Sequence, residues 1–307
     1  MDAFGSSWAH LGGGGVRILL TAILAAATAA GPGHSRAVAG EATPLPPLRT
    51  DAEREAFLLE GEVVEDRAIP QGVTLPRRVT LRWGEHEHDA KIQTLDDYKT
   101  RFKTGSGLEI DFRDSWRNNV AAYRLDRLLG LGFVPVTVVR EYKRQPAAWT
   151  WWVDDVLMSA RERHERKVRP PHPLAWICQI QVVRLFDALI YNFDPTLENL
   201  QIDEDWQLWM IDPSRSFKVF EDLRSQKDLP ARCERRLLAG LRGLDRPTLE
   251  KAMEGLLNEQ QIDGLLARRD TIVRFYDDAI ATRGEPAVVY ELPPRVGVRP
   301  ASRHYAE

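Results

Sequence analysis

The apolar positions of this chain follow different periods in its two halves. Between residues 57 and 158 they fall mostly in short runs with a period of two, which is typical of half-buried β-strands. The runs that predict strands are 78–83, 88–95, 134–139 and a stretch from Trp149 toward Met158, while 57–64 fits a short helix or strand. A long helix is predicted from Asp114 or Ser115 to about Leu129, because its apolar residues share one face and two glycines follow it.

The second half has helical periodicity. Apolar residues recur at helical spacing in 174–191, 229–240, 246–257 and 259–282. A polar loop at 192–199 follows the first of these helices, and a hairpin with an acidic turn spans 200–211. The two halves together predict an α+β fold, in which a β-rich lobe with one long helix precedes a mostly helical lobe.

This pattern divides the chain into four segments. Residues 1–50 form a leader and a proline-rich linker, 51–158 the first lobe, 159–284 the second lobe, and 285–307 a proline-rich mobile tail. The leader has one arginine, Arg17, before an apolar and alanine-rich run with small-x-small sites at 27–29 and 37–39. That layout is typical of a secretory signal, which would place the protein outside the cytoplasm, for example in the periplasm. The other interpretation is an Ala/Gly-rich start of a cytoplasmic protein, and no stable membrane span is expected once a leader is removed.

The composition limits the range of partners. The chain has 307 residues, 43% of them hydrophobic, and a net charge of 42 − 45 = −3, so it has no general attraction for nucleic acid. Basic residues in 161–169 alternate with glutamates, which favours a solvated loop over a dock for an acidic substrate. Of the two cysteines, Cys178 lies in an apolar helical run and is expected to be a core thiol.

Three polar residues of the second half carry candidate chemistry. Asp194 and Asn199 lie in the loop after the apolar helix, and Asp212 ends the second strand of the hairpin. Each alone also fits a turn or a helix cap, because aspartate and asparagine favour both. In this order, between an apolar helix and a hairpin, they fit phosphoryl transfer. One carboxylate orients a hydroxyl, while an amide oxygen and a second carboxylate hold a divalent metal on the phosphates.

These residues resemble those of a known superfamily. The chain is similar to a bacterial member of the atypical protein-kinase-like superfamily, which includes HipA-type kinases, phosphatidylinositol kinase-like proteins and secretory casein-kinase-type enzymes. The resemblance covers residues 55–225 and rests on the Gly72-Val73-Thr74 run, on the helical stretch 116–130 and on the set formed by Asp194, Asn199 and Asp212. It implies a two-lobed protein-kinase-like fold with ATP bound in the cleft between the lobes.

The resemblance also implies a role for individual residues. Asp194 matches the catalytic-loop aspartate, Asn199 and Asp212 match the magnesium ligands, and Gly72 and Thr74 match the loop over the nucleotide phosphates. The implied activity is transfer of the γ-phosphoryl group of ATP to a hydroxyl on a protein, lipid or small molecule. The sequence does not indicate which acceptor is used.

The first lobe departs from the kinase pattern. Lys91 is the natural strand lysine for the phosphates, but Asn119 occupies the position where a helix glutamate is expected to pair with it. Asp126, two turns later, is a candidate substitute. If nothing replaces the glutamate, the alternative is a catalytically weak or inactive pseudokinase that acts as a binding or scaffold module.

Other candidate residues favour structural roles. His86 and His88 have no third metal ligand nearby in the sequence and are expected to be exposed turn residues. Three tryptophans at 149, 151 and 152 fit packing between the lobes better than stacking on a ligand. Arg215, which follows Asp212 closely, is expected at the surface.

Overall fold

The computed structural model describes residues 48–69, 76–104 and 107–292, all within one unit of the chain that begins at Leu45. The leader up to residue 47, the predicted phosphate-loop residues Gly72 and Thr74, and the chain beyond residue 292 lie outside the described residues. Within the described ranges, no helix has both the length and the apolar character that a membrane crossing requires.

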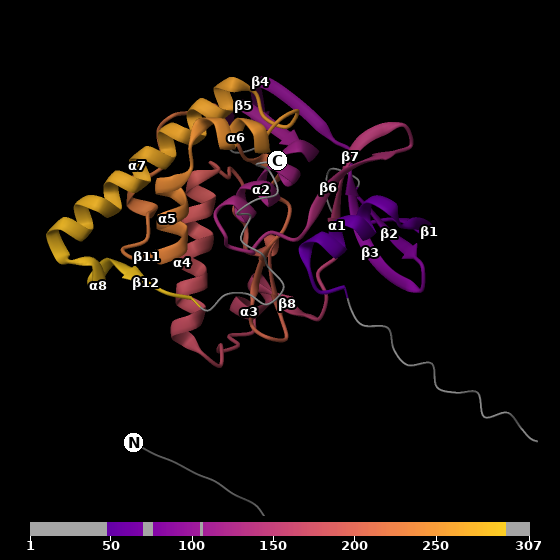
Figure 1. Cartoon of the computed structure of the whole chain (residues 1–307), viewed down its shortest axis with the longest axis horizontal. Coiled ribbons are helices and arrows are strands. Elements are labelled where there is room, and N and C mark those ends of the chain that lie inside the picture. Colours follow the sequence, from indigo (N-terminus) through magenta and orange to yellow (C-terminus); the bar gives the residue numbers. More distant parts are fainter. Residues whose placement is uncertain (1–47, 70–75, 105–106, 293–307) are drawn as a thin grey trace, which may run out of the picture. The chain divides into compact units, whose positions relative to one another are not determined.

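Strands dominate the first half, with α1 before them and α2 among them, and helices dominate the second (Figure 1). The α-helices are α1 (Asp51–Glu60), α2 (Trp116–Leu128), α3 (Ala160–Glu165), α4 (Pro173–Leu189), α5 (Arg235–Gly243), α6 (Arg246–Ala252), α7 (Glu259–Arg283) and α8 (Glu285–Val288). The 3-10 helices are η1 (Leu197–Asn199), η2 (Pro213–Arg215) and η3 (Gln226–Asp228). The strands are β1 (Glu62–Ala68), β2 (Arg77–Trp83), β3 (His86–Gln93), β4 (Asp96–Thr104), β5 (Gly107–Ser115), β6 (Thr137–Tyr142), β7 (Gln145–Trp151), β8 (Val156–Ser159), β9 (Leu200–Asp203), β10 (Leu208–Met210), β11 (Cys233–Glu234) and β12 (Val289–Tyr290).

The first lobe is built on an antiparallel sheet with the strand order β1-β2-β3-β7-β6. Side chains alternate across this sheet, so Leu81 of β2 and Ile92 of β3 are buried while Lys91 points to the other face. Helices α1 and α2 pack on the sheet through contacts with β6 and β7. Strands β4 and β5 form a separate two-stranded ribbon that leads directly into α2 (Figure 1).

The start and end of α2 are fixed by polar side chains. The Ser115 hydroxyl accepts a hydrogen bond from the Arg117 backbone N–H at 3.1 Å, so Ser115 rather than Asp114 caps the helix. After the helix, the buried Asp126 carboxylate accepts the backbone N–H groups of Gly132 (2.9 Å) and Phe133 (3.0 Å). Asp126 therefore holds the turn between α2 and β6.

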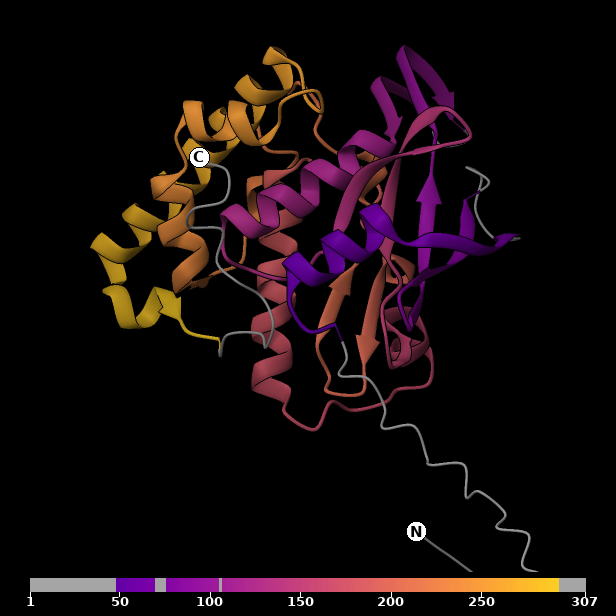
Figure 2. The ribbon, with the colours of Figure 1, turned by 45° about the vertical axis from the view of Figure 1, so that its right-hand side comes forward.

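The second lobe has the small sheet β10-β9-β8 and a helical body. The β9–β10 hairpin lies beside α4 (Figure 2), and α7 packs on α4, α5 and α6. In α7 the buried Arg268 donates hydrogen bonds to the carbonyl oxygens of Leu189 (2.8 Å) and Phe220. Gly264, one turn earlier, lies so close to the chain that a Cβ there would be 2.8 Å from the Val219 carbonyl oxygen. Helix α7 thus fixes the segment that follows Asp212.

The structure differs from the predicted strands in two places. The strand expected from Trp149 toward Met158 is two strands in different sheets: β7 pairs with β3 and β6, whereas β8 pairs with β9. Asp155 lies between them with a positive φ of 51°, so the chain turns there. The ribbon of β4 and β5 was not predicted, because charged residues make up much of both strands, although Leu108, Ile110 and Phe112 alternate with them in β5.

The tail is also shorter than predicted. It was expected to begin at residue 285, but α8 and β12 follow α7 directly, and β12 pairs in parallel with β11. Tyr290 is buried there, and its hydroxyl donates to the Cys178 carbonyl oxygen at 2.8 Å. Both cysteines are free thiols, so this end of the chain is held by packing and hydrogen bonds.

Candidate active site

Asp194 lies in the loop that follows α4. The loop is held by Asn192, whose amide nitrogen donates to Asp187 Oδ1 at 2.7 Å and whose Oδ1 accepts the Asp194 backbone N–H at 3.1 Å. Burial raises the pKa of Asp187 to about 7, and the hydrogen bond from Asn192 opposes that shift. The Asp194 side chain is 50% exposed, and Arg215 Nη1 lies 4.0 Å from its Oδ2. The structure therefore presents this carboxylate at the surface, on a loop held by the hydrogen bonds of Asn192.

Asn199 connects this loop to the strand that carries Asp212. The side-chain nitrogen of Asn199 lies 3.5 Å from the backbone carbonyl oxygen of Asp194. The backbone carbonyl oxygen of Asn199 accepts a hydrogen bond from the Ile211 backbone N–H at 2.9 Å. The second contact places residue 212 next to Asn199 across the hairpin. The structure thus brings the three predicted residues of the second lobe into one neighbourhood.

Asp212 has an uncommon backbone conformation. Its φ of 55° and ψ of 49° are left-handed, and Pro213 follows it. Residues other than glycine rarely adopt this conformation, and a following proline disfavours helical dihedrals as well. Such strain persists where the surroundings hold it, often at functional sites. Here the surroundings aim the Asp212 carboxylate at the first lobe, where Lys91 Nζ lies 3.1 Å from its Oδ1.

The partner of Lys91 differs from the two candidates that the sequence offered. Asn119 of α2 is buried, and its amide donates a hydrogen bond to Gln93 Oε1 at 2.6 Å. As a neutral amide it supplies no charge to pair with Lys91. Asp126 is fully buried in the last turn of α2, where it contacts Arg127 and the backbone of the following turn, and so it does not substitute for the glutamate. Lys91 pairs with Asp212 instead, across the two lobes.

A second carboxylate near Asp212 was missed by sequence reasoning. The pKa of Asp114 is raised, chiefly by burial and also by the negative charge of Asp212, while a hydrogen bond with Ser214 opposes the shift. Its Oδ1 is buried with no hydrogen-bond partner among the described residues. Its position just before a helix had suggested only a cap. In the structure, the Asp114 carboxylate adds negative charge that a bound cation would neutralise.

A cavity of about 400 Å³ adjoins this cluster. Lys91, Asn119 and Asp212 line it, whereas Asp194 and Asn199 lie outside its lining. Apolar residues form much of the remaining wall: Ile69, Val134, Trp152, Val153, Met210 and Ile211. A concave apolar site with a few polar groups at one end is the common form of a small-molecule site.

Two described residues that flank the predicted phosphate-loop segment line the cavity. Ile69 and Pro76, the described residues on either side of the segment with Gly72 and Thr74, both line the cavity. The Ile69 backbone N–H donates to the Pro76 carbonyl oxygen at 2.9 Å, which closes the base of that segment. Of the three tryptophans, Trp149 and Trp151 are buried and Trp152 contributes to the cavity wall.

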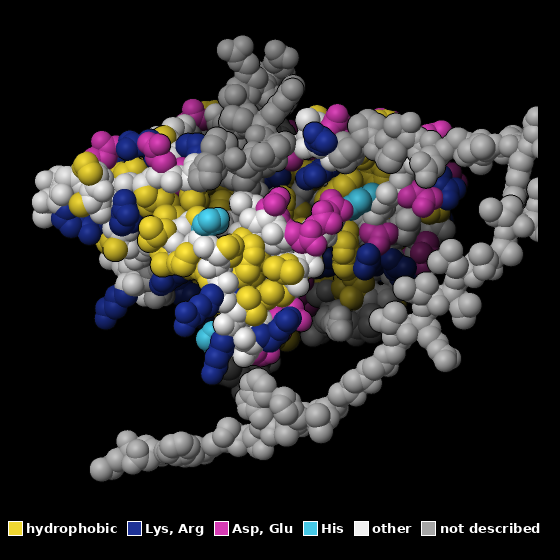
Figure 3. Space-filling view, turned by 90° about the horizontal axis from the view of Figure 1, so that it is seen from below, with side chains coloured by type: hydrophobic (Ala, Val, Ile, Leu, Met, Phe, Trp, Pro, Cys, Tyr) yellow, Lys and Arg dark blue, Asp and Glu magenta, His cyan; other side chains and the backbone are white. Residues whose placement is uncertain are grey.

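A larger cavity of about 530 Å³ neighbours the first and shares Pro135, Trp151 and Val153 with it. Asp154, Asp155 and Asp203 are among its other lining residues. On the face seen in Figure 3, acidic side chains gather beside a histidine. His88 is not the exposed turn residue that was predicted: it stacks on Trp151 with ring centroids 3.6 Å apart, and its Nε2 lies 2.5 Å from Asp154 Oδ1. No group of three or more His, Cys, Asp or Glu among the described residues has the arrangement of a metal site.

Comparisons with known proteins establish the fold. No family model and no curated protein sequence matches this chain. Among solved structures, the chain is similar to hydra Fam20 with sugar, with a TM-score of 0.58 and 14% identity over 80% of this chain and 96% of that one. It is also similar to the Golgi casein kinase with Mn/ADP bound, with a TM-score of 0.54 and 12% identity over 80% of each chain.

These similarities confirm the predicted architecture. The chain has a two-lobed protein-kinase-like fold, similar to the folds of hydra Fam20 and the Golgi casein kinase. At identities of 12–14% the similarity extends to the fold, and the chemistry of the site has to be argued from its own residues.

Proposed function

We propose that this protein is a phosphotransferase that uses ATP and a divalent cation, with magnesium as the physiological metal, to phosphorylate a hydroxyl group. The observation that carries the proposal is the ion pair between Lys91 and Asp212 at the wall of the 400 Å³ cavity. Lys91 offers a cation for phosphate oxygens, and Asp212 offers a carboxylate for a metal. The backbone of Asp212 is held in a strained, left-handed conformation. The Golgi casein kinase, which has a similar fold, is known with Mn/ADP bound, and this supports a nucleotide and a divalent metal as the ligands proposed here.

The residues present fit a divalent cation. Asn199 and Asp212 offer hard oxygen ligands, and the buried, unpartnered Oδ1 of Asp114 adds negative charge nearby. A bound cation would neutralise charge on the transferring phosphates. Lys91 would contact phosphate oxygens. Asp194 would accept the hydrogen bond of the acceptor hydroxyl, orient its oxygen, and take its proton as the new oxygen–phosphorus bond forms and the bond to ADP breaks.

Two variants separate these roles. Asp194→Ala is expected to abolish transfer of label from radiolabelled ATP to water and to the protein itself, while ATP with magnesium still raises the Tm. Asp212→Ala is expected to remove the magnesium-dependent part of that Tm rise. Asp205→Ala, in the exposed turn of the β9–β10 hairpin, is the matched control and should behave as wild type. Normal transfer by both site variants would disprove the assignment.

One observation favours a second candidate, a pseudokinase that binds nucleotide without turnover. Asn119 is bonded to Gln93 and leaves Lys91 without an acidic partner from α2. This candidate predicts a Tm rise with ATP and magnesium in wild type but no label transfer to any acceptor. Label transfer that Asp194→Ala abolishes would exclude it.

A further inference from the structure

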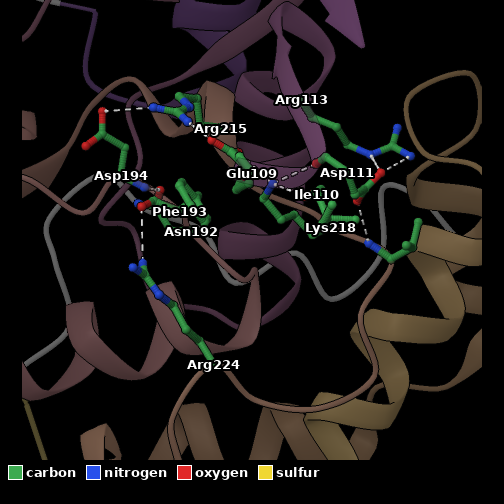
Figure 4. A network of polar contacts seen from close by, with 12 residues as sticks. Glu109, Ile110, Asp111, Arg113, Asn192, Phe193, Asp194, Arg215, Lys218 and Arg224 are labelled. Carbon is green, nitrogen blue, oxygen red and sulfur yellow. Dashed lines mark hydrogen bonds and ion pairs between the residues drawn. The ribbon is translucent and has the colours of Figure 1, made fainter. Parts of the chain in front are cut away.

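The ribbon of β4 and β5 contacts the segment that follows Asp212. Strand β5 packs against η2, and the same strand runs on into α2. In Figure 4, the Glu109 carboxylate faces Arg215 and Lys218, and the backbone carbonyl oxygens of Ile110 and Asp111 face Lys218. The ribbon is therefore in position to influence the chain on which Asp212 lies.

Glu109 is the centre of this contact. Its carboxylate is 2% exposed, and its Oε1 lies 2.7 Å from the Nζ of Lys218, which is fully buried. Its other oxygen, Oε2, accepts a hydrogen bond from Arg215 Nη2. Lys218 also donates to the carbonyl oxygens of Ile110 (3.2 Å) and Asp111 (2.6 Å), so all three protons of its ammonium group have acceptors.

The charges of Glu109, Lys218 and Arg215 indicate which contacts the Arg215 side chain makes. Glu109 and Lys218 neutralise each other, which leaves the positive charge of Arg215 for a further carboxylate. Asp194 is such a carboxylate, with its Oδ2 4.0 Å from Arg215 Nη1, and the charge of Arg215 also opposes the rise in the pKa of Asp114. The rigid guanidinium of Arg215 thus directs Nη2 to Glu109 and Nη1 to Asp194. Arg215 was expected at the surface, but its side chain is only 25% exposed.

The backbone reinforces the link between Arg215 and the Asp194 loop. The Phe193 N–H donates to the Arg215 carbonyl oxygen at 3.0 Å, and Arg224 Nη1 donates to the Phe193 carbonyl oxygen at 3.1 Å (Figure 4). The Phe193 ring lies 4.6 Å from Lys218 Nζ and 5.2 Å from the Arg215 guanidinium carbon, within cation–π range. The Asp194 loop thus rests on the two cations that Glu109 binds.

We propose that Glu109 is a positioning residue, which fixes Arg215 and through it the orientation of the Asp194 carboxylate. The inference rests on the phosphotransfer proposed above for the catalytic meaning of that orientation. It links Glu109, one residue of the β4–β5 ribbon, to Asp194 through the side chain of Arg215.

The first test compares Glu109→Gln with Arg113→Gln. Arg113 lies on the same strand and pairs with Asp111 Oδ1 at 3.0 Å, so its loss breaks an ion pair of the ribbon without touching Arg215. With water as the acceptor, Glu109→Gln should lower kcat for magnesium-ATP hydrolysis about 10- to 100-fold with KM for ATP little changed. Arg113→Gln should leave kcat at the wild-type value. An equal fall of kcat in both variants would overturn the proposal.

A second variant covers the case in which Glu109→Gln does not fold, since it leaves a buried ammonium group unpaired. In the double variant Glu109→Gln/Lys218→Met the buried cation is removed too, while Arg215 still loses its holder. The same fall in kcat is expected. Wild-type kcat in a folded double variant would contradict the positioning role.

A spectroscopic measurement makes the proposal independent of turnover. The Nε–H resonance of Arg215, identified by its loss in Arg215→Lys, should shift in Glu109→Gln and also in Asp194→Asn, but not in Arg113→Gln. If wild type hydrolyses no ATP and the resonance shifts as expected, the proposed function fails while the positioning contact stands. If Asp194→Asn leaves the resonance unchanged, the contact between Arg215 and Asp194 is refuted whatever the activity.

Discussion

Lys91 Nζ lies 3.1 Å from Asp212 Oδ1, so one ion pair joins the main sheet of the first lobe to the end of the β9–β10 hairpin in the second. The two side chains are partly exposed, at 19% and 31%, and both residues line the adjoining cavity, while the paired oxygen Asp212 Oδ1 is itself buried. The contact between the lobes therefore coincides with the place proposed for nucleotide phosphates.

Replacing Lys91 should weaken nucleotide binding. Lys91→Met keeps the length of the side chain but removes its charge, and the loss of one charged contact to phosphate corresponds to about 1.5–3 kcal/mol. Calorimetric titration with magnesium-ADP measures the change in Kd. Lys99→Met, on the exposed β4 strand, is the control and should bind as wild type. Equal Kd values for wild type and Lys91→Met would remove Lys91 from the site.

The buried amide pair of Asn119 and Gln93 should behave as a unit. Asn119→Leu alone leaves Gln93 Oε1 buried without its donor, which costs about 1–3 kcal/mol of unfolding free energy. The double variant Asn119→Leu/Gln93→Met removes both partners and should lose less than the sum of the two single changes. Urea unfolding measures all three variants. Strict additivity would show that the two amides do not interact.

Asp187 should make stability depend on pH. Its pKa in the folded protein is raised to about 7 from an ordinary value of 3.8, so the folded state keeps a proton that the unfolded state releases. This contribution to stability is fully present below pH 3.8 and is lost as the pH rises through about 7. Asp187→Asn retains an oxygen acceptor for Asn192 and removes the titration.

The measurement for Asp187 is the unfolding free energy between pH 4 and 8. The Asp187→Asn variant should gain stability relative to wild type as the pH rises across this range, and the difference should level off above pH 7. A constant difference between the two proteins would mean that this carboxyl group titrates normally.

Gly264 tests the packing of α7 on the segment after Asp212. Alanine is the better helix former, but its Cβ would lie 2.8 Å from the Val219 carbonyl oxygen, so Gly264→Ala should destabilise the protein by about 1–3 kcal/mol. Gly243→Ala in α5 meets nothing within 4 Å and is the matched control, which should be neutral or stabilising. Thermal unfolding of both variants decides the point, and a stable Gly264→Ala would refute the close approach.

The sequence predicted the elements whose side chains face one core. Helices α4 and α7 and the β9–β10 hairpin lie where periodicity placed them, because apolar spacing reports burial directly. The β4–β5 ribbon was missed because charged residues occupy much of both its strands. The break before β8 was missed because a positive φ at Asp155 leaves no apolar signal.

The candidate site was predictable only in part, for a similar reason. Asp194, Asn199 and Asp212 are close in sequence, so a local motif could indicate them. The partners of Lys91 and Arg215 are long-range: Asp212 lies in the other lobe, and Glu109 lies on the ribbon that the sequence did not predict. Asp114 was seen only as a possible cap, because burial and the nearby charge of Asp212 arise from the tertiary fold.

The central claim is that Asn199 and Asp212 share a divalent cation beside a nucleotide. The most direct test is the anomalous difference map of crystals grown with Mn²⁺ and a non-hydrolysable ATP analogue. Our account predicts a metal peak on the order of 2 Å from an oxygen of each of these two side chains, with phosphate oxygens completing its coordination. A peak at the acidic 530 Å³ cavity alone, or a nucleotide bound with no metal near Asp212, would contradict it.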